Sequence, residues 1–234
     1  MLLGGVSVKG SYHEINQDSF ISQRIENGFV VALSDGLGSK KTSQIGSKAI
    51  CESVVEEAIA LKQNLADIPP SEFILNVHKR WLDKLAAHTI NECYATILAL
   101  VFYSGRLLAL RLGDGFIGFW TNDGVHVLFD RKENYFTNET DCLTESFSID
   151  LFEFVEYEIS ELNGGVMCSD GIAIGEMNEN DLKSFTKDFI EGYNSMNVEE
   201  INNDIESWVK DWQGIDDKTL AYFISEVNSN GTAI

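Results

Sequence analysis

The sequence predicts an α+β fold in which two antiparallel sheets pack face to face and a pair of helices covers each sheet. Short apolar runs typical of strands occur before, between and after two pairs of segments with helical apolar spacing. Two layers of strands between two layers of helices would bury all of these apolar stripes. The chain has 234 residues, 44% of them hydrophobic, without an internal repeat or linker. We therefore expect a single domain over residues 1–234, with a frayed tail at about residues 228–234.

Three strands are expected near the start of the chain. Residues 2–9 alternate weakly between apolar and polar side chains, and residues 20–25 form a second candidate strand after a polar turn. Residues 29–33 are five consecutive apolar residues, which indicates a strand buried on both faces. This third strand ends directly at Asp35, so a carboxylate is expected at its end.

Helices are expected in two pairs. One face of the first helix, which begins after Lys41, should pack inward, and Ser71 should cap the second helix after the chain break at Pro69 and Pro70. The second pair lies near the C-terminus. The four apolar stripes are Ile45, Ala49, Val54, Ala58 and Leu61; Ile74, Val77, Trp81 and Leu85; Leu182, Phe185, Phe189 and Tyr193; and Val198, Ile201, Ile205, Trp208 and Trp212.

The middle of the chain is predicted to be β structure. Residues 95–103 and 106–112 are apolar runs joined by a Ser-Gly pair, and residues 116–121 and 125–129 are joined around an Asp-Gly pair. These turn signals predict a meander of four antiparallel strands. Further strands are expected at residues 147–159, 165–168 and 220–224.

Acidic residues occur at four strand ends. Asp35, Asp114 and Asp170 are each followed by glycine directly after an apolar run, and Asp216 and Asp217 directly precede the last run. A single Asp-Gly pair is usually only a turn. If these strands are neighbours, however, the carboxylates converge on one small volume, and charges of like sign at that distance need cations to neutralise them.

The composition limits the classes of partner. Seventeen Lys and Arg residues against 37 Asp and Glu residues give a net charge of −20, which argues against nucleic acid or an anionic membrane as the partner. The four cysteines lack the spacing of a zinc site, and Cys168, inside an apolar run, is expected to be a buried free thiol. Without a signal-like or membrane-length apolar segment, the expected location is the cytoplasm.

The order of these motifs resembles that of the metal-dependent serine/threonine protein phosphatases of type 2C. The resemblance extends from about residue 4 to residue 225 and includes His13, Gln17 and Asp18 as well as the acidic strand ends. Within that family the chain is most similar to a compact bacterial branch. The segments that carry this similarity are ECYATIL at residues 92–98 and NETDCLT at residues 138–144.

The resemblance implies a four-layer αββα sandwich with two Mn²⁺ or Mg²⁺ ions per chain. Oxygen ligands suit these hard cations. Asp35 would bridge both ions, and the Gly36 carbonyl would ligate one of them. Asp170 and Asp216 would hold the other ion, and Asp18 would orient metal-bound water. A third ion near Glu92 is an option, although a solvated charge at a strand edge is the favoured interpretation of that residue.

The implied reaction is hydrolysis of phosphoserine or phosphothreonine in a protein. A hydroxide between the two metal ions would attack phosphorus in line, so no nucleophilic side chain is needed. His13 stands where many relatives have a phosphate-binding Arg. It could bind phosphate, protonate the leaving oxygen, or be a turn residue without a role. Gln17 replaces a Glu that often touches metal-bound water, and Leu37 replaces the His of animal relatives.

Other polar residues are interpreted as structural. Asp114 is expected to hydrogen-bond a turn, and Asp217 to brace the loop beside Asp216. His78, His88 and His126 have no acidic or cysteine partners at ligand spacing and are assigned to the surface or core. The polar segment 131–146 is a candidate flap over the site.

Two alternatives to an active phosphatase remain open at this point. His13, Gln17 and Leu37 motivate a pseudophosphatase that binds a phosphorylated partner without hydrolysing it. A metal-dependent nuclease is disfavoured by the charge of −20 and the lack of a basic stripe. The expected substrate is a phosphoprotein of a bacterial Ser/Thr kinase system, and the acidic surface favours basic phosphosegments.

Overall fold

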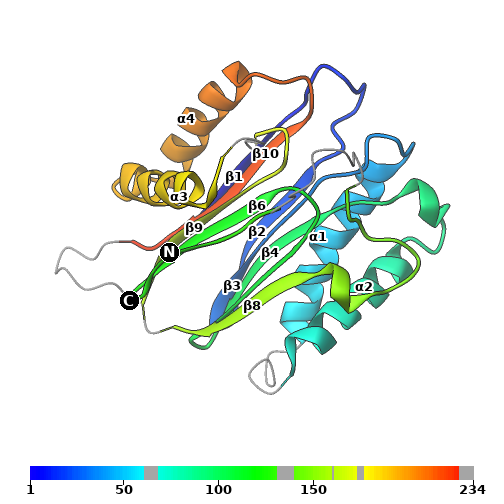
Figure 1. Ribbon diagram of the computed structural model, residues 1–234, viewed down its shortest axis with the longest axis horizontal. Helices are drawn as coiled ribbons and strands as arrows, with labels where there is room; N and C mark the ends of the chain where they lie inside the picture. Colours follow the sequence, from blue (N-terminus) through cyan, green and yellow to red (C-terminus); the bar gives the residue numbers. More distant parts are fainter. Residues whose placement is uncertain (61–67, 131–139, 160, 173–176, 227–234) are drawn as a thin grey trace.

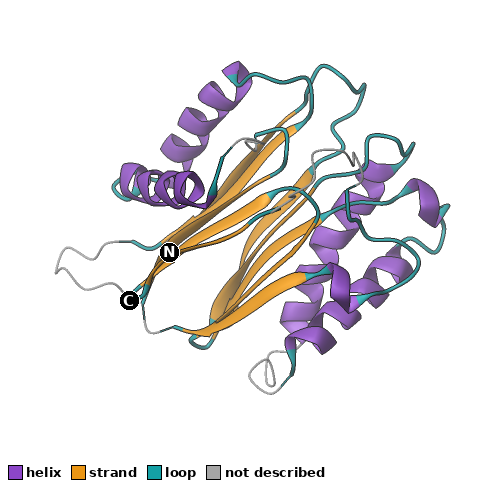
Figure 2. Ribbon diagram, viewed as in Figure 1, coloured by secondary structure: helices purple, strands orange, loops and turns teal. Residues whose placement is uncertain are grey.

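The computed structural model describes residues 1–60, 68–130, 140–159, 161–172 and 177–226. Two five-stranded antiparallel sheets pack face to face, and a pair of helices covers the outer face of each sheet (Figures 1 and 2). This arrangement confirms the predicted α+β, four-layer αββα sandwich. Within the described ranges, no helix combines the length and apolar character needed to cross a membrane.

Each sheet combines strands from distant parts of the chain. The first sheet has the order β2-β3-β4-β5-β8 and the second the order β1-β10-β9-β6-β7. The strands of the first sheet are β2 (Ser19–Ile25), β3 (Gly28–Ser34), β4 (Ile97–Tyr103), β5 (Arg106–Leu112) and β8 (Glu153–Glu158). Those of the second sheet are β1 (Leu2–Val8), β6 (Phe116–Thr121), β7 (Gly124–Leu128), β9 (Leu162–Cys168) and β10 (Lys218–Ile224).

The predicted four-stranded meander is wrong at its centre. Both hairpins, β4–β5 and β6–β7, form as expected. Strands β5 and β6, however, lie in different sheets, and residues 113–115 carry the chain from one sheet to the other. Strand β6 pairs instead with β9, which lies more than forty positions later in the sequence. This crossing places Asp114 between the two sheets at one end of the sandwich.

Strand β3 is buried on both faces, as predicted. Val30 and Ala32 pack toward the helices α1 (Ser43–Ala60) and α2 (Pro70–Lys84), whereas Val31 and Leu33 pack into the core between the sheets. A third core lies between the second sheet and the helices α3 (Glu179–Tyr193) and α4 (Val198–Asp211). The strand therefore holds its C-terminal residue, Ser34, rigidly between two packed layers.

Three details of the predicted elements need correction. Buried residues of α1 lie on more than one face, because this helix packs against α2 as well as against β2 and β3. Ser71 does not cap α2: the N-cap is Pro69, without a side-chain hydrogen bond, and Pro70 occupies the first turn, where its missing N–H costs nothing. The strand expected over residues 147–159 is shorter, because Ile149–Leu151 form a 3₁₀ turn before β8.

Strand β10 brings the end of the described chain beside its beginning. It pairs with β1 on one side and with β9 on the other, so that Ser7 lies opposite Thr219. The segments that precede β10 and follow β9 and β1 therefore meet at one end of the sandwich. The tail at residues 228–234 and most of the candidate flap, residues 131–139, lie outside the described residues.

Candidate metal and phosphate site

A cavity of about 380 Å³, open to solvent, lies at this end of the sandwich. Four aspartates from four separate segments face it, each located at the end or the beginning of a strand. The residues that line it are Asp35, Gly36, Leu37, Gly38, Thr96, Asp114, Thr140, Asp170 and Asp216. The structure thus brings together the acidic strand ends that the sequence predicted to converge.

Asp35 is held by the strand next to β3. Its N–H donates to Thr96 Oγ1 at 2.9 Å, and its carbonyl accepts from the Thr96 N–H at 2.8 Å. The following residue has no room for a side chain, because a Cβ at Gly36 would lie 2.8 Å from the Gln17 carbonyl oxygen. A glycine here lets the loop after β3 pass close to the segment before β2 while Asp35 faces the cavity.

Asp170 and Asp216 are placed by a close contact between two loops. A Cβ at Gly171 would lie 1.9 Å from the Asp217 carbonyl oxygen, so only glycine permits this approach. Asp217 is buried and accepts the Gly10 and Gln17 backbone N–H groups at 2.7 Å each. It braces the loop, as predicted, and leaves the neighbouring Asp216 on the cavity wall.

Asp18 lies behind Asp35, and the cavity does not reach it directly. Its Oδ2 accepts the Ser169 hydroxyl at 2.9 Å, and Ser169 Oγ in turn accepts the Thr219 N–H at 3.0 Å. Asp18 and Asp170 are both within hydrogen-bonding reach of Asp35. Three carboxyl groups, one just before β2 and the others just after β3 and β9, thus lie next to one another.

Burial is the main cause of the raised pKa values of these three carboxyl groups. Loss of solvent raises the pKa of Asp18 from its ordinary value of 3.8 to about 7, although hydrogen bonds from Thr219 and Ser169 oppose the rise. Burial also raises the pKa of Asp35 well above its usual range, and the charges of Asp18 and Asp170 raise it further. The pKa of Asp170 rises to about 6 through burial and then through the charge of Asp114. These raised pKa values mean that binding of a proton or a cation stabilises the site.

The donor set suits a hard divalent cation. Asp170 Oδ1 and Asp18 Oδ1 are buried and have no hydrogen-bond partner within the described residues. Buried carboxylate oxygens without partners are costly unless a cation or proton compensates them. In the part of the chain that the structure describes, no group of three or more His, Cys, Asp or Glu side chains is arranged so that it could hold a metal ion. The fit to cations therefore rests on the free oxygens and on the shared cavity.

Comparison with known proteins identifies the family. The family model described as protein phosphatase 2C matches residues 11–210, which is most of the chain. The chain belongs to the protein phosphatase 2C family. A search of curated proteins found no match.

Solved structures share the fold of this family member at low sequence identity. The serine/threonine phosphatase Stp1 from Staphylococcus aureus is 15% identical over 97% of this chain and 98% of its own, with a TM-score of 0.67. RsbX in complex with magnesium is 16% identical over 93% and 92%, with a TM-score of 0.59. The S. agalactiae serine/threonine phosphatase is 14% identical over 95% and 98%, with a TM-score of 0.63. These neighbours show that the chain has the fold of solved phosphatase structures, in agreement with the family match.

The residues that depart from the pattern of the better-known branches either line the cavity of this family member or lie near Gly38 on its wall. The His13 ring stacks edge-on against Tyr12, and a Cβ at Gly38 would lie 2.9 Å from His13 Nε2. Leu37 lines the cavity. The Gln17 side chain is buried, with its Oε1 lacking a partner within the described residues. His13 therefore reaches the edge of the site, and its three proposed roles remain predictions.

Two cavity residues, Thr96 and Asp114, are more important to the site than the sequence indicated. Thr96 fixes both backbone groups of Asp35, and its only sequence signal was its place in the ECYATIL segment. Asp114 accepts the Thr140 hydroxyl at 2.6 Å, consistent with the predicted hydrogen-bonding role, but it also faces the cavity beside Asp170. An Asp-Gly pair in the sequence does not show whether the aspartate only hydrogen-bonds a turn or also faces a cavity.

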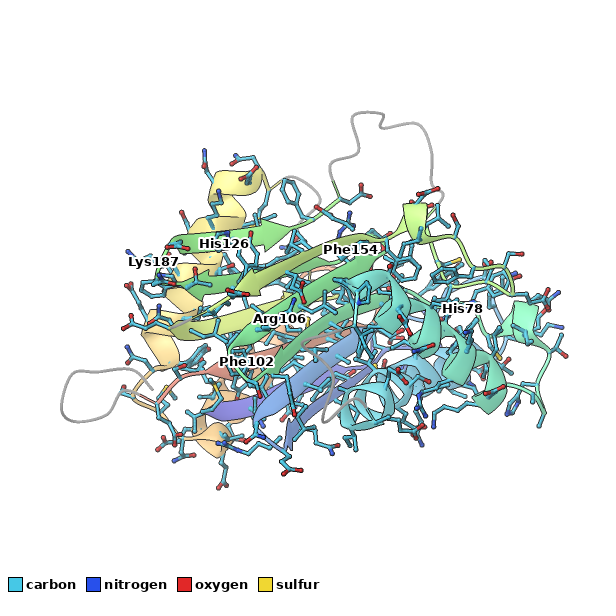
Figure 3. All side chains as sticks on the ribbon, turned by 90° about the horizontal axis from the view of Figure 1, so that it is seen from below. His78, Phe102, Arg106, His126, Phe154 and Lys187 are labelled. Atoms are coloured by element: carbon cyan, nitrogen blue, oxygen red, sulfur yellow. The ribbon has the colours of Figure 1, made fainter. Side chains whose placement is uncertain are left out.

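The remaining polar candidates lie apart from the cavity. Glu92 belongs to a 3₁₀ turn, not to a strand edge, and its carboxylate accepts the Lys41 N–H at 3.1 Å. Figure 3 places His78 and His126 at opposite ends of the molecule. His78 bonds the Thr144 carbonyl, and His126 is stacked on Phe119, so both are structural as predicted. A third cation near Glu92 stays a prediction.

Proposed function

We propose that this protein is a metal-dependent phosphatase that hydrolyses phosphoserine or phosphothreonine in proteins. The observation that carries the proposal is the meeting of Asp35, Asp170 and Asp216 around one open cavity in a chain of the protein phosphatase 2C family. The cofactors would be two Mn²⁺ or Mg²⁺ ions, since carboxylate and carbonyl oxygens suit both. Magnesium in the RsbX structure supports this choice.

The aspartates and one carbonyl would hold the cations. Asp35 would be the central ligand, because it faces the cavity and lies close to Asp170. The Gly36 carbonyl, Asp170 and Asp216 would supply further ligands from the cavity wall. Bound there, the cations would activate water and offset the charge of the phosphoryl group. Asp18 would fix the orientation of Asp35 from behind.

His13 is the proposed contact to the substrate. It lies at the Gly38 edge of the cavity and carries the only imidazole in the segment between β1 and β2. As an imidazolium it would bind phosphoryl oxygens, and it would donate a proton to the leaving seryl or threonyl oxygen. The four cysteines are free thiols, three of them buried, and none lines the cavity, so a thiol nucleophile is not part of the proposal.

The deciding experiment removes one carboxylate. Asp35→Asn should lower Mn²⁺-dependent release of phosphate from a phosphothreonine peptide by at least about a hundredfold, because a central ligand is lost. Asp188→Asn, on the exposed face of α3, is the matched control and should retain wild-type turnover. Near-normal turnover by Asp35→Asn would overturn the proposal.

A pseudophosphatase is the second candidate, and Leu37 and Gln17 favour it. Leu37 places an apolar side chain on the cavity wall, and Gln17 puts a neutral amide where relatives have a carboxylate. Colorimetric phosphate release by the purified protein with and without Mn²⁺ separates the two functions. Release that depends on the metal excludes the pseudophosphatase. The proposed substrates are phosphoproteins of a bacterial Ser/Thr kinase system.

A further inference from the structure

Large apolar side chains are exposed on two loops that lead to the cavity wall. Five large hydrophobic residues are exposed within the described part of the chain, and four of them lie on only two loops. Tyr12 is 68% and Ile15 58% exposed between β1 and β2, whereas Trp212 is 40% and Ile215 61% exposed between α4 and β10. Single exposed hydrophobic residues are ordinary, but a group of four on adjacent loops is not. We call these four residues the rim patch.

The two loops are joined directly. The Tyr12 N–H donates to the Ile215 carbonyl oxygen at 3.0 Å. A Cβ at Gly10 would lie 2.3 Å from the same oxygen, so the backbones are in close contact along this stretch. Figure 1 shows the dark-blue loop between β1 and β2 beside the orange loop between α4 and β10 at the top of the view. The two loops that carry the rim patch are therefore in direct contact, with Tyr12 and Ile215 at the point where they meet.

The rim patch adjoins the cavity at two points. Ile215 directly precedes Asp216, which lines the cavity. On the other loop, Tyr12 stacks edge-on against His13 with ring centroids 4.6 Å apart, and His13 reaches Gly38 at the cavity edge. Consecutive Cα atoms lie about 3.8 Å apart, so a residue two or three positions from a phosphorylated residue in the cavity would extend beyond the cavity wall, where Ile215 adjoins Asp216.

We propose that the rim patch binds an apolar side chain of the substrate, two to four residues from the phosphorylated serine or threonine. This inference rests on the proposed phosphatase function and adds a preference among phosphoprotein segments. The exposed acidic residues Glu14 and Asp211 lie on the same two loops or next to them, so a basic residue beside the apolar one would be tolerated.

The size of the patch favours a peptide segment over a second copy of this chain. A stable interface between proteins buries about 800 Å² on each partner and involves about 20 to 30 residues on each side. Four side chains on two loops are too few for that, but they suffice for one or two anchoring side chains of an extended segment. The cavity also requires that a polypeptide leave it across its rim.

The test compares two phosphothreonine peptides that differ only at the flanking position, with Leu in one and Ser in the other. We expect wild-type protein with Mn²⁺ to prefer the Leu peptide about tenfold in kcat/KM, mostly through KM, as burial of one side chain allows. Ile215→Ser and the double variant Tyr12→Ser/Ile215→Ser should reduce this ratio to near one. Leu151→Ser is the matched control, since Leu151 is 45% exposed outside the patch, and it should keep the ratio.

A binding measurement separates this inference from the proposed function. Peptides with a hydrolysis-resistant phosphonate in place of the phosphate ester are titrated by fluorescence polarisation, so the preference can be measured without turnover. If wild-type protein hydrolyses neither peptide but binds the Leu phosphonate more tightly, the result contradicts the proposed phosphatase function and supports the binding role of the rim patch. Equal kcat/KM and equal affinity for both peptides, or an equal loss for both in Ile215→Ser, overturn the patch. A wild-type dimer that Ile215→Ser dissociates in light scattering also overturns it.

Discussion

Asp18→Asn should stabilise the metal-free protein at neutral pH. The folded protein raises the pKa of Asp18 from 3.8 to about 7 through burial. A rise of that size corresponds to about 4 kcal/mol in the free energy of unfolding, lost from the wild type as the carboxyl ionises. An asparagine at this position carries no charge, and its carbonyl can still accept the Ser169 hydroxyl. The expected increase in Tm is about 10 °C for a chain of this length.

The sign of the pH dependence is fixed by the direction of the shift. Because the folded state holds its proton to higher pH than the unfolded state, ionisation of Asp18 costs stability between about pH 4 and pH 7. The gain from Asp18→Asn should therefore be close to zero at pH 4 and full at pH 8. For each protein, the free energy of unfolding at pH 4 is the reference for its value at pH 8.

The assay is urea unfolding at pH 4, 6 and 8 in EDTA, followed by circular dichroism. Asp123→Asn in the exposed β6–β7 turn is the matched control and should change the free energy of unfolding by less than about 0.5 kcal/mol. A gain from Asp18→Asn that is absent at pH 8, or equally large at pH 4, would refute the reasoning. In either case the burial of Asp18 would not control its ionisation. If Asp18 fixes the orientation of Asp35, as we propose, phosphatase activity of this variant should fall.

Three further outcomes are expected. Asp217→Ala should lower the free energy of unfolding by about 3 kcal/mol in urea, since the buried N–H groups of Gly10 and Gln17 lose their acceptor; an unchanged midpoint would contradict this. Mg²⁺ at a hundred times its Kd should stabilise the wild type by about 2.7 kcal/mol in differential scanning fluorimetry, and no shift would argue against a cation site. Arg80→Met should cost about 3 kcal/mol, because the Glu57 carboxylate is 3% exposed and pairs with Arg80. Glu57→Gln combined with Arg80→Met should recover much of that loss.

The strands and the site could be predicted because each depends on local sequence. Apolar runs mark buried strands whatever their neighbours, so β3 and β10 were found close to their true bounds. The carboxylates of the site lie at the ends of such runs, where a strand that is packed on both faces fixes their position. Convergence then follows from the face-to-face packing of the two sheets, which brings the end of β3 opposite the end of β9, without any sequence signal linking Asp35 to Asp170.

Pairing between strands could not be predicted in the same way. The Ser104–Gly105 turn and the residues 113–115 are both short connections with glycine, yet the first closes a hairpin and the second changes sheet. Local turn chemistry decides how tightly the chain bends but does not decide which sheet the next strand joins. That choice depends on β6 packing beside β9, a strand of distant sequence. The role of Asp114 depends on the same crossing.

The adjacent residues Asp216 and Asp217 show how the fold tolerates so many carboxylates at one end. Asp217 is fully compensated by two backbone N–H groups, so its charge stabilises the loops. Asp18 and Asp170 each keep a buried oxygen that has no hydrogen-bond partner among the described residues, so their charges destabilise the metal-free protein. A bound cation and the change Asp18→Asn would both reduce the cost of these buried negative charges. The stabilisation from Mg²⁺ and from Asp18→Asn should therefore be less than additive when combined, whereas the loss caused by Asp217→Ala should persist in the presence of the metal.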